Sequence, residues 1–169
     1  FTLAAMEAQG RDIKMSESRV EGYRNFATKL WNAARFCEAN RCVRDAAFVP
    51  AVCMGTVNRW IVGETARATA TIVKALEAYR FNEAANAVYQ FSWGVFCDWF
   101  VEFSKPVLNG PDGTEKNEAR ATMAWVLEQI LGLLHPFMPF VTEELWEHMG
   151  KRESMLIESI LEVFEVRHD

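Results

Sequence analysis

The sequence has few residues that break helices and no segment long enough to cross a membrane. Its 169 residues include nine glycines and five prolines, and no apolar run approaches the roughly 20 residues that a spanning helix needs. It also has no run of strict period-two alternation bounded by hairpin turns. These absences argue against a membrane protein and a β-sheet fold. The chain starts at Phe1 without a secretion-type leader, so we expect an internal fragment of a cytoplasmic protein.

The four cysteines lack the spacing of a metal site. They are Cys37, Cys42, Cys53 and Cys97, none forms a C-x-x-C pair, and the three histidines lie far from them in sequence. Zinc sites have closely spaced ligand pairs. We therefore expect no metal, and free thiols of which two or more are buried.

The residues that are present predict an all-α protein, a bundle of about five helices. Half of the residues are hydrophobic and 24% are charged, as in an ordinary globular domain. Apolar side chains recur at three- and four-residue steps, which predicts helices over 18–39, 54–78, 82–104, 116–134 and 139–149. Lys105-Pro106 is expected to end the third helix. Its predicted core stripe is Ala84, Ala85, Val88, Phe91, Val95, Trp99 and Phe103, and all six tryptophans are expected in or beside the core.

Positive charge gathers near the start of the chain. The net charge is −5, but residues 11–44 hold eight Lys or Arg against four Asp or Glu, a local balance of +4, which leaves −9 for the remainder. No acid occurs between Glu21 and Glu38, whereas a solvated helix face normally carries Glu for pairing. The segment therefore favours an anionic partner, with an ordinary solvated face as the alternative.

The first predicted helix places a polar stripe opposite its core side. At about 100° per residue, Arg24, Thr28, Asn32 and Arg35 share this stripe. Asn25 and Lys29 flank it, and Arg41 and Arg44 follow the helix. Arginine makes bidentate contacts to phosphates and base edges, and asparagine can distinguish bases by paired donor and acceptor groups. The stripe has the side chains of a nucleic-acid contact.

No catalytic group of residues stands out. Lys14–Ser18 is similar to the Lys-Met-Ser-Lys-Ser loop of class I tRNA synthetases, but Glu17 reverses the charge at the fourth position and no glycine-rich phosphate loop accompanies it. We interpret it as the lead into the first helix. His135 precedes Pro136, where a helix-ending role is expected, and His148 suits the negative end of the last helix.

Five segments carry a family resemblance: 22–36 (GYRNFATKLWNAARF), 58–61, 79–84, 93–100 and 135–146. Together they resemble the anticodon-binding domain of valyl-tRNA synthetases, which belong to class Ia, over about residues 9–150. The resemblance implies a lead-in from the catalytic region at 1–17, the helical bundle at 18–150, and a tail at 151–169 toward a missing C-terminal region. The tail lacks the Trp-Pro expected in this family.

The resemblance also implies a site and a function. The first helix and the turn after it would read the anticodon, through Arg24, Asn25, Lys29, Asn32, Arg35 and Arg41. Where some relatives carry a stacking aromatic residue, this chain has Cys42 or Phe48. The implied partners are tRNA and the catalytic domain of the same enzyme, in a monomer that has no membrane contact. Valine ligation, with its ATP and Mg²⁺, would take place on other domains, and we expect no cofactor or catalytic residue in this fragment. The alternatives are an isoleucine or leucine tRNA ligase, or a helical protein-docking module that binds no RNA.

Overall fold

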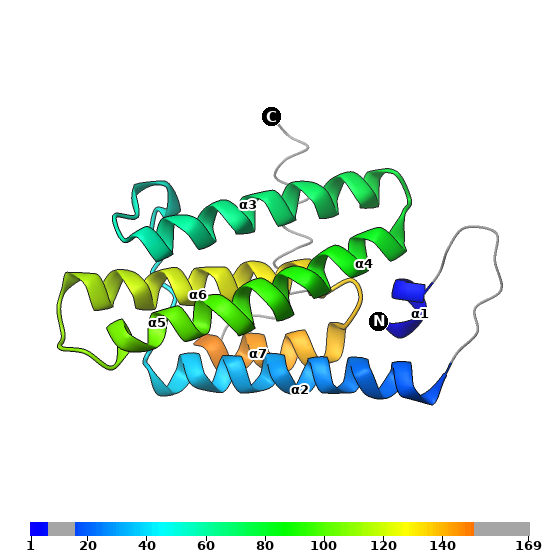
Figure 1. Ribbon diagram of the computed structural model, residues 1–169, viewed down its shortest axis with the longest axis horizontal. Coiled ribbons are helices and arrows are strands. Elements are labelled where there is room, and N and C mark those ends of the chain that lie inside the picture. Colours follow the sequence, from blue (N-terminus) through cyan, green and yellow to red (C-terminus); the bar gives the residue numbers. More distant parts are fainter. Residues whose placement is uncertain (7–15, 151–169) are drawn as a thin grey trace.

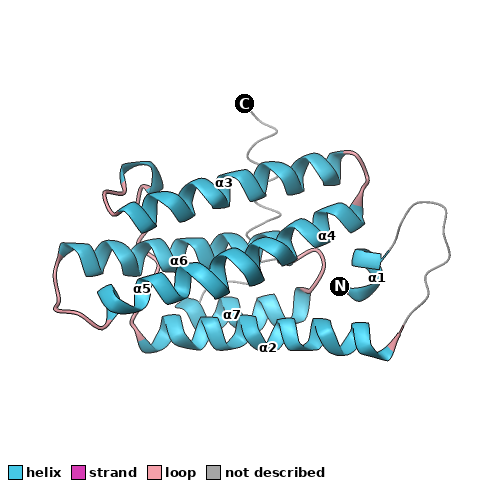
Figure 2. Ribbon diagram, viewed as in Figure 1, coloured by secondary structure: helices cyan, strands magenta, loops and turns pink. Residues whose placement is uncertain are grey.

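The computed structural model describes residues 1–6 and 16–150, and these residues form helices joined by loops, without a strand (Figure 2). This confirms the all-α prediction. The elements are α1 (Thr2–Met6), α2 (Glu17–Ala39), the 3₁₀ turn η1 (Pro50–Val52), α3 (Thr56–Glu77), α4 (Phe81–Gln90), the π-helix η2 (Phe91–Phe100), α5 (Val101–Leu108), α6 (Thr114–Leu134) and α7 (Pro139–Gly150). The predicted tail at 151–169 and most of the predicted lead-in, including Lys14 and Met15, lie outside the described residues.

The helices run side by side in an antiparallel bundle. Figure 1 shows α2 and α3 along opposite edges, with α6 and the continuous α4–η2–α5 helix between them and α7 beside α2. One hydrophobic cluster fills the interior. Its largest fully buried side chains include Phe26, Leu30, Ile61, Ile72, Phe96, Phe100, Met123, Leu127 and Ile130. Burial of this apolar surface is the main stabilising contribution. Among the described helices, none has the length and apolarity needed to span a bilayer.

The predicted core stripe of the third helix is wrong after Phe91. The buried positions there are Phe91, Ser92, Phe96, Cys97, Phe100 and Val101. The steps from Phe91 to Phe96 and from Ser92 to Cys97 are five residues, where an α-helix spaces buried positions by three or four. A π-helix bonds residue i to residue i+5 and places such pairs on one side. As a result Trp99, predicted in the core, is 56% exposed, Phe103 is also exposed, and Val95 is half-buried.

Lys105-Pro106 does not end this helix, contrary to the prediction. The helix continues through Pro106 to Leu108. Proline removes one backbone donor and crowds the carbonyl four residues earlier. Pro106 is exposed and lies two residues from the helix end, so few backbone bonds depend on it.

A side chain from α6 caps the start of α3. Gly55 is the N-cap of α3 and has no side chain to accept from the first backbone N–H groups. Instead the Glu118 carboxylate accepts from Met54 N at 2.9 Å, Gly55 N at 2.8 Å and the buried Asn58 Nδ2 at 2.7 Å. A Cβ at position 55 would lie 2.9 Å from Asn58 Nδ2 and 3.0 Å from a Glu118 oxygen, so the cap requires glycine there.

Glu118→Ala is expected to lower the free energy of unfolding by about 1–3 kcal/mol at pH 7, because it leaves the buried Asn58 amide without its acceptor. Burial raises the pKa of Glu118, but the hydrogen bonds from Asn58, Met54 and Gly55 outweigh it and lower the pKa overall. A carboxyl group with a lowered folded pKa stabilises the fold above its unfolded pKa of roughly 4.3, and this contribution is lost as the pH falls through the folded pKa. Urea unfolding from pH 7 downward should show the difference from the wild type shrinking. Glu147→Ala, at an exposed position of α7, is the control, and an equal loss in both variants would contradict the cap.

The four cysteines are free and buried, as predicted. Of the six tryptophans, Trp146 is buried, four are partly buried against the core, and Trp99 is the exposed exception.

Candidate nucleic-acid interface

The polar stripe of α2 faces solvent in the structure. Phe26, Leu30 and Cys37 point into the core, and the opposite face exposes Arg24, Asn25, Thr28, Asn32 and Arg35. Thr28 Oγ1 donates to the Arg24 carbonyl at 3.2 Å. Within the described part of the chain, neither Arg24 nor Arg35 forms an ion pair. Both guanidinium groups can therefore bind an anion without first breaking an ion pair with a carboxylate in the described part of the chain.

Lys29 differs from its neighbours on the stripe. Its ammonium group pairs with Asp98 of η2 and lies 4.5 Å from the centre of the Trp93 ring. The Asp98 side chain is exposed to solvent and accepts a hydrogen bond from Lys29 of α2. A phosphate at Lys29 would have to compete with Asp98, so Lys29 is the least available of the predicted contacts.

The turn after α2 is a Schellman motif with Arg41 at its left-handed position. Cys42 N donates to the Cys37 carbonyl and Arg41 N donates to the Glu38 carbonyl, both at 2.9 Å. Arg41 has φ 57°, a conformation that glycine usually adopts and that costs other residues about 1–2 kcal/mol. Arg120 of α6 holds the turn by donating from Nε to the Asn40 carbonyl at 2.9 Å. The motif fixes the backbone position from which the exposed Arg41 side chain extends.

Positive charge surrounds this turn. Lys116 pairs with Asp112 at 3.1 Å, and Arg120 lies 3.7 Å from the same carboxylate. Lys116, with Arg120 and Arg41 at longer range, lowers the pKa of Asp112. Arg44, the other cation after the helix, pairs with Glu128 of α6 at 3.3 Å. The end of the bundle at which α2 stops therefore carries lysine and arginine side chains both from α6 and from the segment that follows α2.

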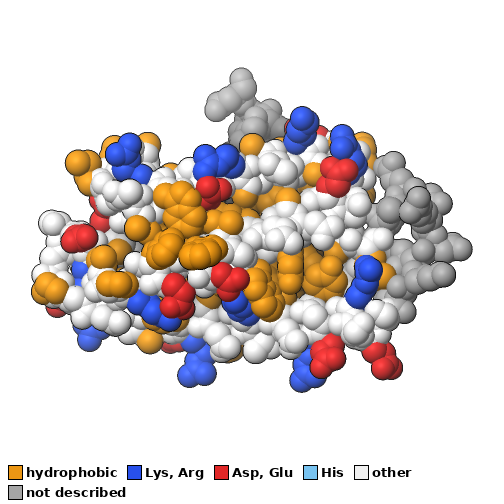
Figure 3. Space-filling view, in the orientation of Figure 1, with side chains coloured by type: hydrophobic (Ala, Val, Ile, Leu, Met, Phe, Trp, Pro, Cys, Tyr) orange, Lys and Arg blue, Asp and Glu red, His pale blue; other side chains and the backbone are white. Residues whose placement is uncertain are grey.

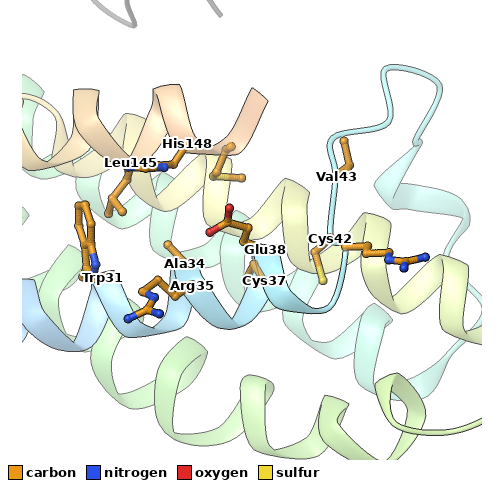
Figure 4. A pocket seen from close by; sticks show the side chains of 11 residues that line it. Trp31, Ala34, Arg35, Cys37, Glu38, Cys42, Val43, Leu145 and His148 are labelled. Carbon is orange, nitrogen blue, oxygen red and sulfur yellow. The ribbon is translucent and has the colours of Figure 1, made fainter. Parts of the chain in front are cut away.

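A cavity of about 350 Å³ lies between the second half of α2, this turn and α7 (Figure 4). Trp31, Arg35 and Glu38 line it from α2, and Leu145 and His148 line it from α7. Arg41 and Met149 also contribute to the wall. The volume falls within the range of small-ligand sites. Its wall offers an indole, a carboxylate and two guanidinium groups, which are groups that stack on or hydrogen-bond to nucleobases.

Most of this cavity could not be predicted from the sequence. Trp31 and Glu38 belong to α2, but α7 adds Leu145, His148 and Met149 from more than 100 residues further along the chain. The six predicted contacts are only partly brought together: Arg35 and Arg41 reach the cavity, whereas Arg24, Asn25, Lys29 and Asn32 do not line it. Cys42 is buried and Phe48 packs on Trp125 with ring centres 6.3 Å apart. Cys42 lines the cavity but has no ring to stack, and the aromatic rings of the wall are those of Trp31 and His148, with centres 5.6 Å apart.

A second surface feature is an aromatic cluster of Trp60, Trp99 and Phe103, whose successive ring centres lie 6.2 and 5.5 Å apart. Figure 3 shows hydrophobic side chains gathered on this face of the bundle. Two cations on the same helices are paired, Arg67 with Glu64 and Lys105 with Glu102.

The remaining candidate groups have structural contacts. His135 is the C-cap of α6 and its Nδ1 lies 2.8 Å from Thr142 Oγ1, which confirms the helix-ending role. His148 lies 3.4 Å from Glu144 in the last part of α7. In residues 1–6 and 16–150, no group of three or more His, Cys, Asp or Glu is placed to hold a metal ion.

Comparison with known proteins identifies the family to which the chain belongs. Residues 58–167 match the family described as the anticodon-binding domain of tRNA ligase, and the chain belongs to this family. It is similar to valine–tRNA ligase of Bradyrhizobium diazoefficiens, with 62% identity over 156 residues. The corresponding enzymes of Rhodopseudomonas palustris and Caulobacter vibrioides are 58% and 57% identical over 156 and 161 residues. These matches cover 92–93% of the chain but only 16–18% of each relative, so the chain spans about one-sixth of their length.

Proposed function

We propose that this chain recognises the anticodon stem-loop of a valine-accepting tRNA as the anticodon-binding part of a valine–tRNA ligase. The observation that carries the proposal is the exposed face of α2 between Glu21 and Glu38, which carries no acidic residue and leads to a cavity bordered by Arg35 and Arg41. Membership of the anticodon-binding family and similarity to valine–tRNA ligases support it.

In this proposal the side chains of α2 and of the turn after it make different kinds of contact with the RNA. Arg24, Arg35 and Arg41 hold phosphates or base edges, and Asn25 and Asn32 supply paired donors and acceptors. Anticodon bases are unstacked in their loop and can be splayed out for reading. Trp31 and Glu38 in the cavity wall then offer a stacking surface and an acceptor for an exocyclic amino group. Lys29 contributes only if it exchanges Asp98 for a phosphate.

The ligation itself would take place outside this chain. ATP and Mg²⁺ would bind the catalytic domain of the same enzyme, with residues 1–17 leading in from it and residues 151–169 leading on from the 18–150 bundle. The cluster of the partly buried Trp60 with the exposed Trp99 and Phe103 supports a contact with the rest of that enzyme. The proposed whole is a monomeric, cytoplasmic enzyme of protein synthesis.

The test is fluorescence anisotropy of the chain against a valine-tRNA anticodon stem-loop at two salt concentrations, with a scrambled-anticodon loop as the control RNA. We expect preferential, salt-sensitive binding. Arg24→Ala should weaken it by roughly 1–3 kcal/mol, the range for a bidentate base contact. Arg67→Ala, at an exposed arginine of α3 that pairs with Glu64, should not change it.

Equal binding of both loops would show that the α2 face is only an electrostatic surface. The same assay with isoleucine and leucine anticodon loops distinguishes a valine ligase from an isoleucine or leucine ligase. Both of these loops should bind less tightly than the valine loop. Absence of binding to any loop would favour a helical docking module instead.

A further inference from the structure

The turn that ends α2 carries two cysteines in contact. In a Schellman motif the side chain three positions before the C-cap frequently contacts the one that follows the left-handed residue. Here those positions hold Cys37 and Cys42, on either side of Arg41. The 2.9 Å hydrogen bond from Cys42 N to the Cys37 carbonyl keeps the two backbones close, and their two thiols interact directly.

Both thiols lie at the cavity described above. Cys37 and Cys42 each contribute to its wall, and Figure 4 shows the Cys42 sulfur directed toward the last turn of α2. Both residues are buried from bulk solvent, with Cys42 6% exposed. A small neutral oxidant can reach them through the cavity, whereas a bulky thiol reagent would be hindered.

The surroundings differentiate the two thiols. Arg120, anchored on the Asn40 carbonyl next to the turn, places a positive charge near Cys42. The hydrogen bond from Cys37, opposed by burial and aided by Arg120, lowers the pKa of Cys42. The same hydrogen bond, together with burial, raises the pKa of Cys37. A pair with one thiolate-prone member and one protonated donor has the arrangement of attacking and resolving cysteines.

The geometry points to a thiol modification site at which a peroxide oxidises Cys42 and Cys37 to an intramolecular disulfide. The Cys42 thiolate attacks one oxygen of hydrogen peroxide, breaks the O–O bond and becomes a sulfenic acid, and the hydroxide released takes up a proton. The Cys37 sulfur then attacks the Cys42 sulfur, its thiol proton leaves with the sulfenic hydroxyl as water, and the S–S bond forms. In total two thiols and one peroxide give one disulfide and two waters. A thiol reductant reverses the cross-link.

The chain provides matched controls in Cys53 and Cys97. Both are buried and free, but neither follows the end of a helix in this way. Burial raises the pKa of Cys53, and it raises the pKa of Cys97 to about 12. Each pKa unit lowers the thiolate fraction about tenfold, so Cys42 should react at least about tenfold faster than Cys97.

The experiment treats the chain with hydrogen peroxide, blocks the remaining thiols with an alkylating agent, digests with trypsin and measures peptide masses. Trypsin cuts after Arg35, Arg41 and Arg44, so Cys37 and Cys42 fall in different peptides, 36–41 and 42–44. A disulfide joins these two peptides with the loss of two hydrogen atoms. We expect the joined pair, reversed by a reductant, while Cys53 and Cys97 stay alkylated.

Three results would overturn the assignment: no joined peptides, accumulation of oxidised Cys42 without a cross-link, or a dominant Cys37–Cys97 link. The variant Arg120→Lys keeps a positive charge, and Arg120→Met removes it while both cysteines remain. Oxidation should slow in Arg120→Met relative to Arg120→Lys, with circular dichroism confirming that both fold. Equal oxidation rates in the two variants would remove Arg120 from the site.

A further consequence rests on the proposed function. An anticodon loop held by Arg35 and Arg41 would cover the cavity and slow formation of the cross-link. If a saturating stem-loop leaves the rate unchanged, this coupling is wrong although the disulfide site stands. If no RNA binds at all, the proposed function fails and the peptide masses still decide the disulfide.

Discussion

Phe26→Ala is expected to lower the free energy of unfolding by about 3–5 kcal/mol, the largest stability effect we expect for a single substitution in this chain. Phe26 is fully buried on α2. Its ring lies 4.9 Å from Tyr89, 5.7 Å from Phe1 and 6.3 Å from Trp93 by ring centres. Truncation removes these contacts and leaves a cavity that the surrounding aromatic side chains cannot fill without moving. Urea unfolding followed by far-ultraviolet circular dichroism measures the change.

Phe140→Ala is the matched control, because Phe140 is 91% exposed at the start of α7. Its effect should stay within about 0.5 kcal/mol, as for most surface substitutions. A loss of less than about 1 kcal/mol in Phe26→Ala would mean that α2 is not packed through this ring. Because α2 carries the candidate interface, such a result would also remove the rigid support on which the site depends.

The double variant Arg35→Ala/Arg41→Ala is expected to weaken anticodon stem-loop binding by on the order of 10²-fold or more. Each arginine borders the cavity, and each contact of this kind is worth roughly 1–3 kcal/mol, or about tenfold per 1.4 kcal/mol. Losing two phosphate contacts should also reduce the slope of log K against log salt by about 1.4 for a single-stranded site. Titrations at three or more salt concentrations measure both quantities.

The control for this pair is Arg67→Ala/Arg80→Ala, which removes two exposed arginines that lie in and just after α3 and pair with Glu64 and Glu83. Its affinity and salt slope should match those of the wild type. If both double variants lose affinity equally, the RNA reads only the total charge of the chain. If neither does, the binding surface lies away from the end of α2.

Regular helical periodicity was enough to predict α2 in full. It starts one residue earlier than expected and ends at the predicted residue, and its buried positions Phe26, Leu30, Ala33 and Cys37 all lie opposite the predicted polar stripe. The exposure of Arg24, Asn32 and Arg35 follows directly from the same geometry. The predicted stripe therefore exists as a surface, and its role in binding RNA stays a prediction.

What could not be predicted depends on long-range contacts or on an unusual backbone. Lys29 meets Asp98 across 69 positions of sequence, and the cavity needs α7 beside α2. The left-handed turn falls on Arg41, where sequence rules look for glycine or asparagine. Arg41→Gly would relieve that conformation while removing a predicted RNA contact, so stability and binding should change in opposite directions.

The π-helix in the middle of the bundle has the same effect as inserting a residue into an α-helix. Because each of its turns accommodates one more residue than an α-turn, η2 shifts the sides on which later residues fall, and this is why Phe100 and Val101 point inward while Trp99 points outward. Deleting a single residue from 91–100 would turn all of α5 by about 100° relative to α4. The length of this segment, more than the identity of its side chains, therefore decides which aromatic rings the domain shows to its neighbours.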